Sequence, residues 1–211
     1  MLKLVDLPEP RAFSPHEVRL IEGTYALVAQ RGVQQMSLRA IARELDVSPG
    51  LLVYHFSTHE DLLMATMQWA FDQAVQRMQS HIEALEDPEA LLTGLLDVVL
   101  SNATTNREHI LIYMDFLQFS LRNPRFARTM RLWRDYLDGF YSSVVRAGTE
   151  AGVFRVDDVE SATRHIRAIV EGHCLQWLQE PDWRNSHQAL RAACETHLLA
   201  FLQASDRAEQ S

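Results

Sequence analysis

A short segment near residue 50 carries side chains suited to contacting a polyanion. Ser48 precedes Pro49 and Gly50, and Tyr54 and His55 follow about one turn later. Serine followed by proline is typical of a helix start, where free backbone amides and a hydroxyl suit phosphate oxygens. The tyrosine and the histidine add groups that could reach phosphates or base edges. The chemistry that this segment favours is recognition of a nucleic acid.

Two short helices are predicted to hold this segment. The first helix is indicated by apolar residues at helical spacing, namely Leu38, Ile41, Ala42 and Leu45. Asp46 interrupts this pattern, and the second helix begins at Pro49. Only Leu52 and Phe56 of the second helix are spaced to enter a core, so its other side is left for a partner. We predict a helix-turn-helix over residues 37–56, whose second helix enters the major groove of DNA.

Flanking helices should close the small core of this motif. A helix is predicted from Ser14 to Arg31, followed by Gly32 as a stop signal. Thr58, with Glu60 and Asp61 behind it, predicts the cap of a long helix that continues past residue 74. The predicted DNA-binding domain therefore spans residues 14–74 and shares a continuous helix with the rest of the chain.

Residues 14–74 resemble the TetR family of bacterial transcriptional regulators. The resemblance is carried by Ser37-Leu38-Arg39-Ala40-Ile41-Ala42, Val47-Ser48-Pro49-Gly50, Tyr54-His55-Phe56 and Glu60-Asp61-Leu62-Leu63. It implies an all-α, dimeric repressor with an N-terminal DNA-binding head and a larger body that binds a small effector. The chain departs from the family pattern at Asp46, Val53 and His59, where glycine, tyrosine and lysine are usual.

Candidate DNA contacts follow from the geometry of the motif. Hydroxyls at helix starts suit phosphates, and the first turn of the second helix meets base edges. A capping role for each hydroxyl is compatible with a phosphate contact, and a surface histidine is the simple alternative for His55. The predicted DNA-binding residues are Ser37, Arg39, Ser48, Pro49, Gly50, Leu51, Tyr54, His55, Thr58 and His59.

The charge of the chain is uneven. It has 20 basic and 28 acidic residues among 211, for a net charge of −8. Residues 1–57 hold six of each sign, so the acidic excess lies entirely in the remainder. Because the N-terminal head has no net charge, it does not repel DNA. Its binding to DNA is predicted to depend on helix N-termini, hydroxyls and groove contacts more than on a basic patch.

Composition predicts a cytoplasmic helical protein. An apolar share of 47% with 8 glycines and 7 prolines fits an all-α fold. The sequence offers no membrane-length apolar run and no secretory signal, so neither a membrane partner nor export is expected. Cys174 and Cys194 are interpreted as small buried residues in a reducing compartment.

Five helices are predicted after residue 82, near residues 88–103, 106–121, 124–147, 157–179 and 186–204. The signals are Asp87-Pro88 and Asn123-Pro124, and a capping arrangement of Asp157 with Glu160. These helices predict an effector-binding and dimerisation domain over residues 82–205.

Aromatic side chains in this domain suggest a pocket for a small, largely apolar or aromatic effector. Such residues at helical spacing also serve as plain core, which is the simpler reading for any single one. The predicted effector-binding residues are Trp69, Tyr113, Phe116, Trp133, Tyr136, His173 and Trp177.

Two other ligands are conceivable from the sequence, an anion and a metal ion. An anion could bind the arginines at 122, 125, 128, 131 and 134. Residues three apart lie at successively different angles around a helix, so these arginines cannot all face one pocket. Surface ion pairs of Arg131 with Asp135 and of Arg134 with Asp138 are favoured instead. His165 and His173 lie two turns apart and do not form a metal motif. No metal and no cofactor are expected.

The last two predicted helices carry apolar stripes that should form a homodimer through a four-helix bundle. A two-fold dimer matches a palindromic operator in double-stranded DNA. Part of each stripe should cover the body of the same subunit. The predicted interface residues are Ile166, Ile169, Val170, Leu190, Cys194, His197, Leu198 and Phe201.

Three functions from different classes fit the sequence to different degrees. The first is a DNA-binding repressor released by an effector. The second is an enzyme, for which the sequence offers no nucleophile–base arrangement, phosphate loop or metal motif. The third is a helical interaction module that has lost operator binding, which His59 and the neutral head make conceivable. The motif favours the first.

Overall fold

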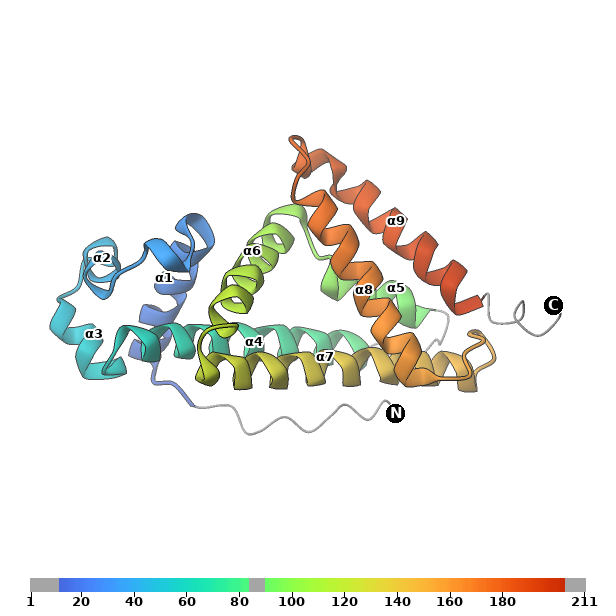
Figure 1. The fold of residues 1–211 in the computed structure, drawn as a ribbon, viewed down its shortest axis with the longest axis horizontal. Helices are drawn as coiled ribbons and strands as arrows, with labels where there is room; N and C mark the ends of the chain where they lie inside the picture. The colour runs from blue at the N-terminus through green and yellow to red at the C-terminus, as the bar shows by residue number, and fades with distance from the viewer. Residues whose placement is uncertain (1–11, 84–89, 204–211) are drawn as a thin grey trace. The chain divides into compact units, whose positions relative to one another are not determined.

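The computed structural model describes residues 12–83 and 90–203, and every regular element in these ranges is helical (Figure 1). The elements are α1 (Pro15–Arg31), the 3₁₀ turn η1 (Val33–Gln35), α2 (Leu38–Glu44), α3 (Pro49–Phe56), α4 (His59–Glu83), α5 (Ala90–Val99), α6 (Ala103–Ser120), α7 (Pro124–Glu150), α8 (Val159–Trp177) and α9 (Trp183–Gln203). The predicted all-α class is confirmed.

The described residues form two compact units. The head unit comprises residues 12–76 and 108–133, and the body unit comprises residues 77–83, 90–107 and 134–203. Helices α4, α6 and α7 each contribute to both units. The sequence-based division at residues 74 and 82 differs from this one, because most of α6 and the start of α7 belong with the head.

Helix α1 begins at a complete capping box. The Glu17 amide donates to Ser14 Oγ at 3.3 Å, and the Ser14 amide donates to Glu17 Oε2 at 2.9 Å. The helix ends at Gly32, whose φ of +78° lies in the region that glycine favours and whose amide donates to the Val28 carbonyl. Both ends lie where the sequence predicts them.

One cluster in the head unit joins the three-helix core to the start of α4. Ile21 from α1, Ile41 from α2 and Leu52 from α3 are fully buried, and Phe56 closes the cluster at 3% exposure. The predicted core residues Leu52 and Phe56 are confirmed. Burial of this kind stabilises each side chain by about 1.5–3 kcal/mol, so the small head has a core of its own.

A second cluster in the head unit ties α1 and α4 to α6 and α7. Val28 and Met67 meet Phe116 and Phe126, and both phenylalanines are fully buried. Because this cluster contains residues from α6 and α7, it explains why residues 108–133 group with the head.

In the body unit, α8 and α9 pack as a pair (Figure 1). Phe154, in the turn before α8, rests on Gly148 of α7, where a Cβ atom would stand 2.0 Å from the ring. The Arg155 amide donates to the Leu202 carbonyl at 2.8 Å and fixes the end of α9. Helix α5 joins α9 through the ion pair of Asp97 with Arg191.

Several predicted helix boundaries are wrong by a few residues. A new helix starts at Ala103, because Asn102 caps it by accepting from the Thr105 amide at 3.0 Å. Asp158 caps α8 instead of Asp157, since its carboxylate accepts from the Ser161 amide. Helix α9 starts at Trp183 and not near residue 186. The Asn123 cap is confirmed, and Asp87-Pro88 lies outside the described residues.

Cys174 and Cys194 are both buried and free, as predicted. Burial raises the pKa of the Cys174 thiol to about 12 and that of the Cys194 thiol to about 11. At neutral pH both sulfurs are therefore protonated and act as apolar core atoms.

Candidate DNA-binding surface

Helix α3 presents one side to the core and the other to solvent. Ser48 caps it, since its Oγ accepts from the Leu51 amide at 3.1 Å, and Pro49 occupies the first helical position. Tyr54 is 82% exposed and Val53 is 49% exposed, whereas Leu52 is fully buried. The side of α3 that faces away from the core thus carries small, hydroxyl and aromatic side chains that are accessible to solvent.

The turn between α2 and α3 sets the orientation of α3. Asp46 adopts a φ of +53°, in the left-handed region where glycine is common and aspartate is tolerated. The Val47 amide then donates to the Ala42 carbonyl at 2.9 Å and closes the turn. Aspartate in place of the family's usual glycine therefore leaves the helix-turn-helix geometry intact.

His55 lies in a ring cluster that sequence reasoning missed. Its ring centre is 5.1 Å from that of His16 on α1 and 5.1 Å from that of Tyr54. Arg19 donates to His16 Nδ1 at 3.0 Å, so an exposed guanidinium lies beside the same cluster. The sequence does not single out His16 and Arg19, because the helical pattern of α1 is defined by its apolar stripe. The cluster extends the accessible surface from α3 onto the start of α1.

Three hydroxyls predicted to contact phosphate are helix caps. Ser37 Oγ accepts from the Ala40 amide at 3.1 Å, in the same manner as Ser48. Accepting this bond leaves each serine hydroxyl proton able to point outward. Thr58 differs, because its hydroxyl donates to Asp61 Oδ2 at 2.6 Å. Its proton is used and a carboxylate stands beside it, so we withdraw the Thr58 side chain as a phosphate donor.

His59 also departs from its predicted role. Its side chain is partly buried and bonds to the Met36 backbone. Burial lowers the pKa of His59 below its ordinary value, and the neighbouring Glu60 and the Met36 bond only partly oppose this. The ring is therefore neutral near pH 7 and supplies no charge to a phosphate. The sequence could not reveal this inward orientation.

The cations of the motif lie on α2. Arg39 is exposed, as is Arg43, whose side chain is 75% exposed. Glu44 takes a bond from Arg31 at 3.0 Å and a longer one from Arg43 at 3.4 Å, and these bonds lower the pKa of Glu44. Arg39 forms no ion pair with a described residue, so its guanidinium is available to a partner, whereas Arg43 shares Glu44 with Arg31.

Helix α6 is bonded directly to the chain just before the motif. Asp115 Oδ2 accepts from the Val33 amide at 3.0 Å, and Gln34 donates to Gln118 Oε1 at 2.9 Å. Arg125 of α7 pairs with Asp61 at 2.8 Å, and Thr58 and Arg125 together hold the pKa of Asp61 below its ordinary value. These bonds connect α6 to η1 and α7 to α4 within the head unit.

A cavity of about 280 Å³ lies at this junction in the head unit. Its wall joins the end of α3, through His55 and Ser57, to α4 and to Arg125. Ser57 has a φ of +59°, so the chain turns sharply between α3 and α4 at the edge of the cavity.

The predicted effector residues are divided between the two units. In the head unit, the Trp69 ring lies edge-on to that of Tyr25, and the Trp133 ring stacks on that of Phe71 with centres 4.4 Å apart. Tyr113 is half-buried against the second cluster, in which Phe116 is fully buried. Trp69, Tyr113 and Trp133 keep some accessible surface.

The other three residues belong to the body unit. Tyr136 is 1% exposed, and burial raises its pKa to about 12. Trp177 is buried, and its indole Nε1 donates to the Trp183 carbonyl at 2.8 Å. His173 bonds to His197 at 2.7 Å on the accessible side of α8 and α9. We therefore withdraw His173 from the effector set, because it does not share the buried side of α8.

The structure separates the two apolar stripes that the sequence could not divide. Five predicted interface residues are at most 6% exposed inside a single chain and cannot meet a partner, namely Ile166, Val170, Leu190, Cys194 and Leu198. Ile169, His197 and Phe201 stay accessible. The five buried residues were therefore wrongly predicted to lie in the interface and belong to the core of the single chain, because α8 and α9 pack on one another.

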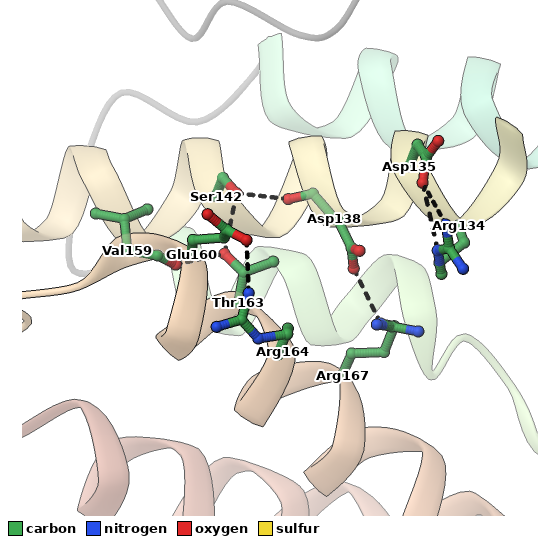
Figure 2. A network of polar contacts seen from close by, with 9 residues as sticks. All are labelled: Arg134, Asp135, Asp138, Ser142, Val159, Glu160, Thr163, Arg164 and Arg167. Carbon is green, nitrogen blue, oxygen red and sulfur yellow. Dashed lines mark hydrogen bonds and ion pairs between the residues drawn. The ribbon is translucent and has the colours of Figure 1, made fainter. Parts of the chain in front are cut away.

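The predicted surface ion pairs of α7 are wrong in their partners. Arg134 pairs with the adjacent Asp135, while Asp138 turns to Arg167 of α8 at 2.9 Å (Figure 2). One turn later, Ser142 Oγ and Thr163 Oγ1 lie 2.9 Å apart, which adds a second polar bridge between α7 and α8 (Figure 2). Asp138 thus has an interhelical role that spacing along one helix could not predict.

The described residues were compared with two further features, a membrane-spanning helix and a cluster of metal ligands. No helix within residues 12–83 and 90–203 is long and apolar enough to cross a bilayer. In the same ranges, no three histidine, cysteine or carboxylate side chains gather as metal ligands would.

The fold and the exposed α3 define a helix-turn-helix DNA-binding regulator with a helical body. Residues 20–66 match the N-terminal region of the bacterial regulatory proteins of the tetR family, and residues 88–203 match the C-terminal region of BetI-type transcriptional repressors. The chain belongs to the TetR family of transcriptional regulators, as the sequence motifs predict.

Individual relatives agree with this assignment. The chain is 26% identical over 156 residues to the transcriptional repressor KstR2 of Mycobacterium tuberculosis, covering 70% of this chain and 74% of that protein. A TetR regulator from Haloarcula marismortui superposes with a TM-score of 0.80 at 24% identity, over 90% of this chain and 100% of the other. A regulator from Saccharomonospora viridis in complex with choline gives 0.79 at 23% identity, over 88% and 96%. These two structures are similar in fold.

Proposed function

We propose that this regulator is a repressor that binds a palindromic operator as a homodimer and is released by a small effector. The observation that carries the proposal is the accessible side of α3, with Tyr54 82% exposed above a fully buried Leu52. A helix fixed to a core on one side and bare on the other suits the major groove. Such a protein acts in the cytoplasm, where its operator is.

The contact set that we propose follows the accessible surface. Ser37 and Ser48 offer hydroxyl protons to phosphates, and Arg39 offers a charge. Pro49, Gly50 and Leu51 let the backbone approach the bases, and Tyr54 and His55 continue along α3. His16 and Arg19 on α1 join the set, because their ring and guanidinium adjoin His55.

We propose that the effector is largely apolar or aromatic and contacts Trp69, Tyr113 and Trp133. These side chains lie on α4, α6 and α7 of the head unit, and each keeps accessible surface. Phe116 would form the floor beneath them. The relatives offer two probes of different chemistry, since one solved relative is a ketosteroid transcriptional regulator and another was solved in complex with choline.

A mobility-shift titration tests the repressor proposal. DNA from around the encoding gene is titrated with wild-type protein, with Tyr54→Ala and with Leu121→Ala. Leu121 is 78% exposed at the end of α6, so its truncation controls for loss of an exposed side chain. Loss of at least about tenfold in affinity for Tyr54→Ala alone supports the proposal. Absence of retardation at low salt for the wild type contradicts it.

Thermal-shift screening tests the effector proposal. A steroid and choline are added separately to wild type and to Trp133→Leu, and stabilisation of the wild type alone by an apolar ligand supports the proposed wall. Stabilisation by choline that Trp133→Leu does not alter would contradict it.

A further inference from the structure

A pair of histidines joins α8 to α9 on their accessible side. His173 and His197 have nitrogens 2.7 Å apart, ring centres 4.9 Å apart and ring planes only 15° apart. Nitrogens this close at this centre spacing point at one another, so the rings share one in-line hydrogen bond between nearly parallel planes. One proton lies between two basic atoms, and the geometry leaves no room for a second.

The histidine pair lies among the accessible residues of both helices. A second ring pair, His165 with Phe201 at 5.0 Å, lies farther along the same two helices, and Ile169 lies between the two histidines of α8. Ala168, Gly172 and Ala200 are small and not buried, which permits close approach of another helix. We call this set of residues the histidine face.

Fixed charges near the histidine face are paired or are directed to other elements. Within residues 164–176 and 193–203 they are Arg164, Arg167, Glu171 and Glu195. Arg164 pairs with Glu160 of its own helix at 2.6 Å (Figure 2). Arg167 pairs with Asp138 of α7 (Figure 2), and Glu195 accepts from Thr93 of α5 at 3.5 Å. Glu171 is half-buried near Arg167 and Asp138, and burial raises its pKa. The buried thiols of Cys174 and Cys194 lie on the core side of the two helices.

A face without unpaired fixed charge suits contact with its own copy. In an isologous dimer each residue meets the same patch of the other subunit, so a net charge on the patch would repel itself. The histidine face is neutral when its imidazoles are neutral, and it gains like charges on both subunits when they take up protons. The other charged neighbours on α9, Arg191 and the partly buried His187, bond to α5 and α6.

We propose that the histidine face is an acid-sensitive contact between two copies of this chain, which separates the dimer when the His173–His197 pair takes up a second proton. The inference rests on the proposed homodimer and adds a regulatory input to it. A first proton keeps the shared bond as N–H⁺···N. A second proton removes the acceptor, breaks the bond and places two like charges together on each subunit.

The direction of the effect follows from linkage. Burial, and then the neighbouring His197, lower the pKa of His173 in the folded chain. Contact with a second copy buries the pair further and lowers proton affinity again. Whichever state binds fewer protons is favoured at higher pH, so the dimer is stable near neutrality and weakens as the pH falls below the ordinary histidine range.

Sedimentation of the full-length protein between about pH 8 and about pH 5.5 tests the proposal, with circular dichroism at each pH to confirm folding. The variants are His173→Gln with His197→Gln, which remove the titrating groups, and His16→Gln in the head as a matched control. We expect the dimer dissociation constant of wild type and control to rise at least about tenfold on acidification, and that of the double variant to change less than about threefold.

The possible outcomes distinguish a failure of the proposed homodimer from a failure of the proposed acid sensitivity. A monomer at the upper pH overturns the homodimer and the histidine inference together. A dimer whose dissociation constant does not respond to pH, or responds equally in the double variant, overturns only the histidine inference. A response in wild type and control that the double variant lacks establishes it.

Discussion

Asp115 on α6 accepts a hydrogen bond at 3.0 Å from the backbone amide of Val33, a residue 82 positions earlier in the chain. The amide belongs to η1, the turn that leads into α2. The left-handed Gly32 makes the approach possible, since a Cβ atom there would stand 3.3 Å from the Asp115 carboxylate. A single side chain thus connects α6 of the head unit to the start of the DNA-binding motif.

Asp115→Ala should destabilise the head unit and weaken its response to effector. Removal of the carboxylate leaves a partly buried amide without its acceptor, which costs about 1–3 kcal/mol of unfolding free energy. The change is measured by urea denaturation and by operator release at increasing effector concentration. Gln118→Ala, which removes only the exposed bond to Gln34, is the control and should cost less than about 0.5 kcal/mol. Equal effects of the two substitutions would refute a special role for Asp115.

Operator affinity should depend only moderately on salt. Two exposed arginines per subunit, Arg19 and Arg39, belong to the proposed contact set, so a dimer neutralises about four phosphates and the slope of log K against log salt is about −4. Arg39→Gln should reduce its magnitude by about 2 per dimer. Arg146→Gln, an exposed arginine in the body unit, should leave the slope unchanged. A slope that Arg39→Gln does not alter would exclude this arginine from the interface.

Asp72 on α4 should make the protein more stable in mild acid. Burial raises the pKa of Asp72 from 3.8 to about 6, so between these pH values the folded state holds a proton that the unfolded state has lost. Its contribution is fully present below the unfolded pKa and disappears as the pH rises through about 6. Asp72→Asn should therefore add about 1 kcal/mol at neutral pH, a value reduced for partial solvent exposure.

Thermal unfolding of Asp72→Asn at several pH values provides the measurement. The gain should shrink as the pH falls, and Asp135→Asn, at a side chain that is 61% exposed, should show no such trend. A constant gain across the pH series would mean that desolvation of the carboxylate is not its source.

Leu52→Ala and Tyr54→Ala should separate stability from recognition, although the residues are two apart on α3. Leu52 is fully buried, so its truncation should cost about 2–5 kcal/mol of unfolding free energy. Tyr54 is 82% exposed, so its loss should change stability by no more than about 0.5 kcal/mol. Calorimetry that finds Tyr54→Ala strongly destabilising would show that this tyrosine is structural.

Local signals in the sequence were sufficient for the head. Ser14, Ser48 and Asn123 each bond within their own helix start, so their role is visible in a few neighbouring residues. Asp46 adopts the left-handed turn conformation, which aspartate tolerates although glycine is usual at this position. The amphipathic spacing of Leu52 and Phe56 was enough to place them in the core.

Contacts between helices were not accessible from the sequence in the same way. The partner of Asp138 is on α8 and not one turn away on α7, and that of Asp115 lies in η1. The stripe on α8 is apolar both where it meets α9 and where it stays accessible, so spacing could not tell Ile166 from Ile169. His59 was misjudged because its bond to the Met36 backbone depends on a fold of the chain that no local pattern records.

Methylation interference on the operator tests the central claim most directly. Methyl groups at guanine N7 obstruct the major groove, whereas those at adenine N3 obstruct the minor groove. With α3 of each subunit in the major groove, N7 methylation should block binding in two patches related by a two-fold axis and about one helical turn or a multiple of it apart. Interference from adenine N3 alone, or from neither position while the protein still binds, would contradict the account.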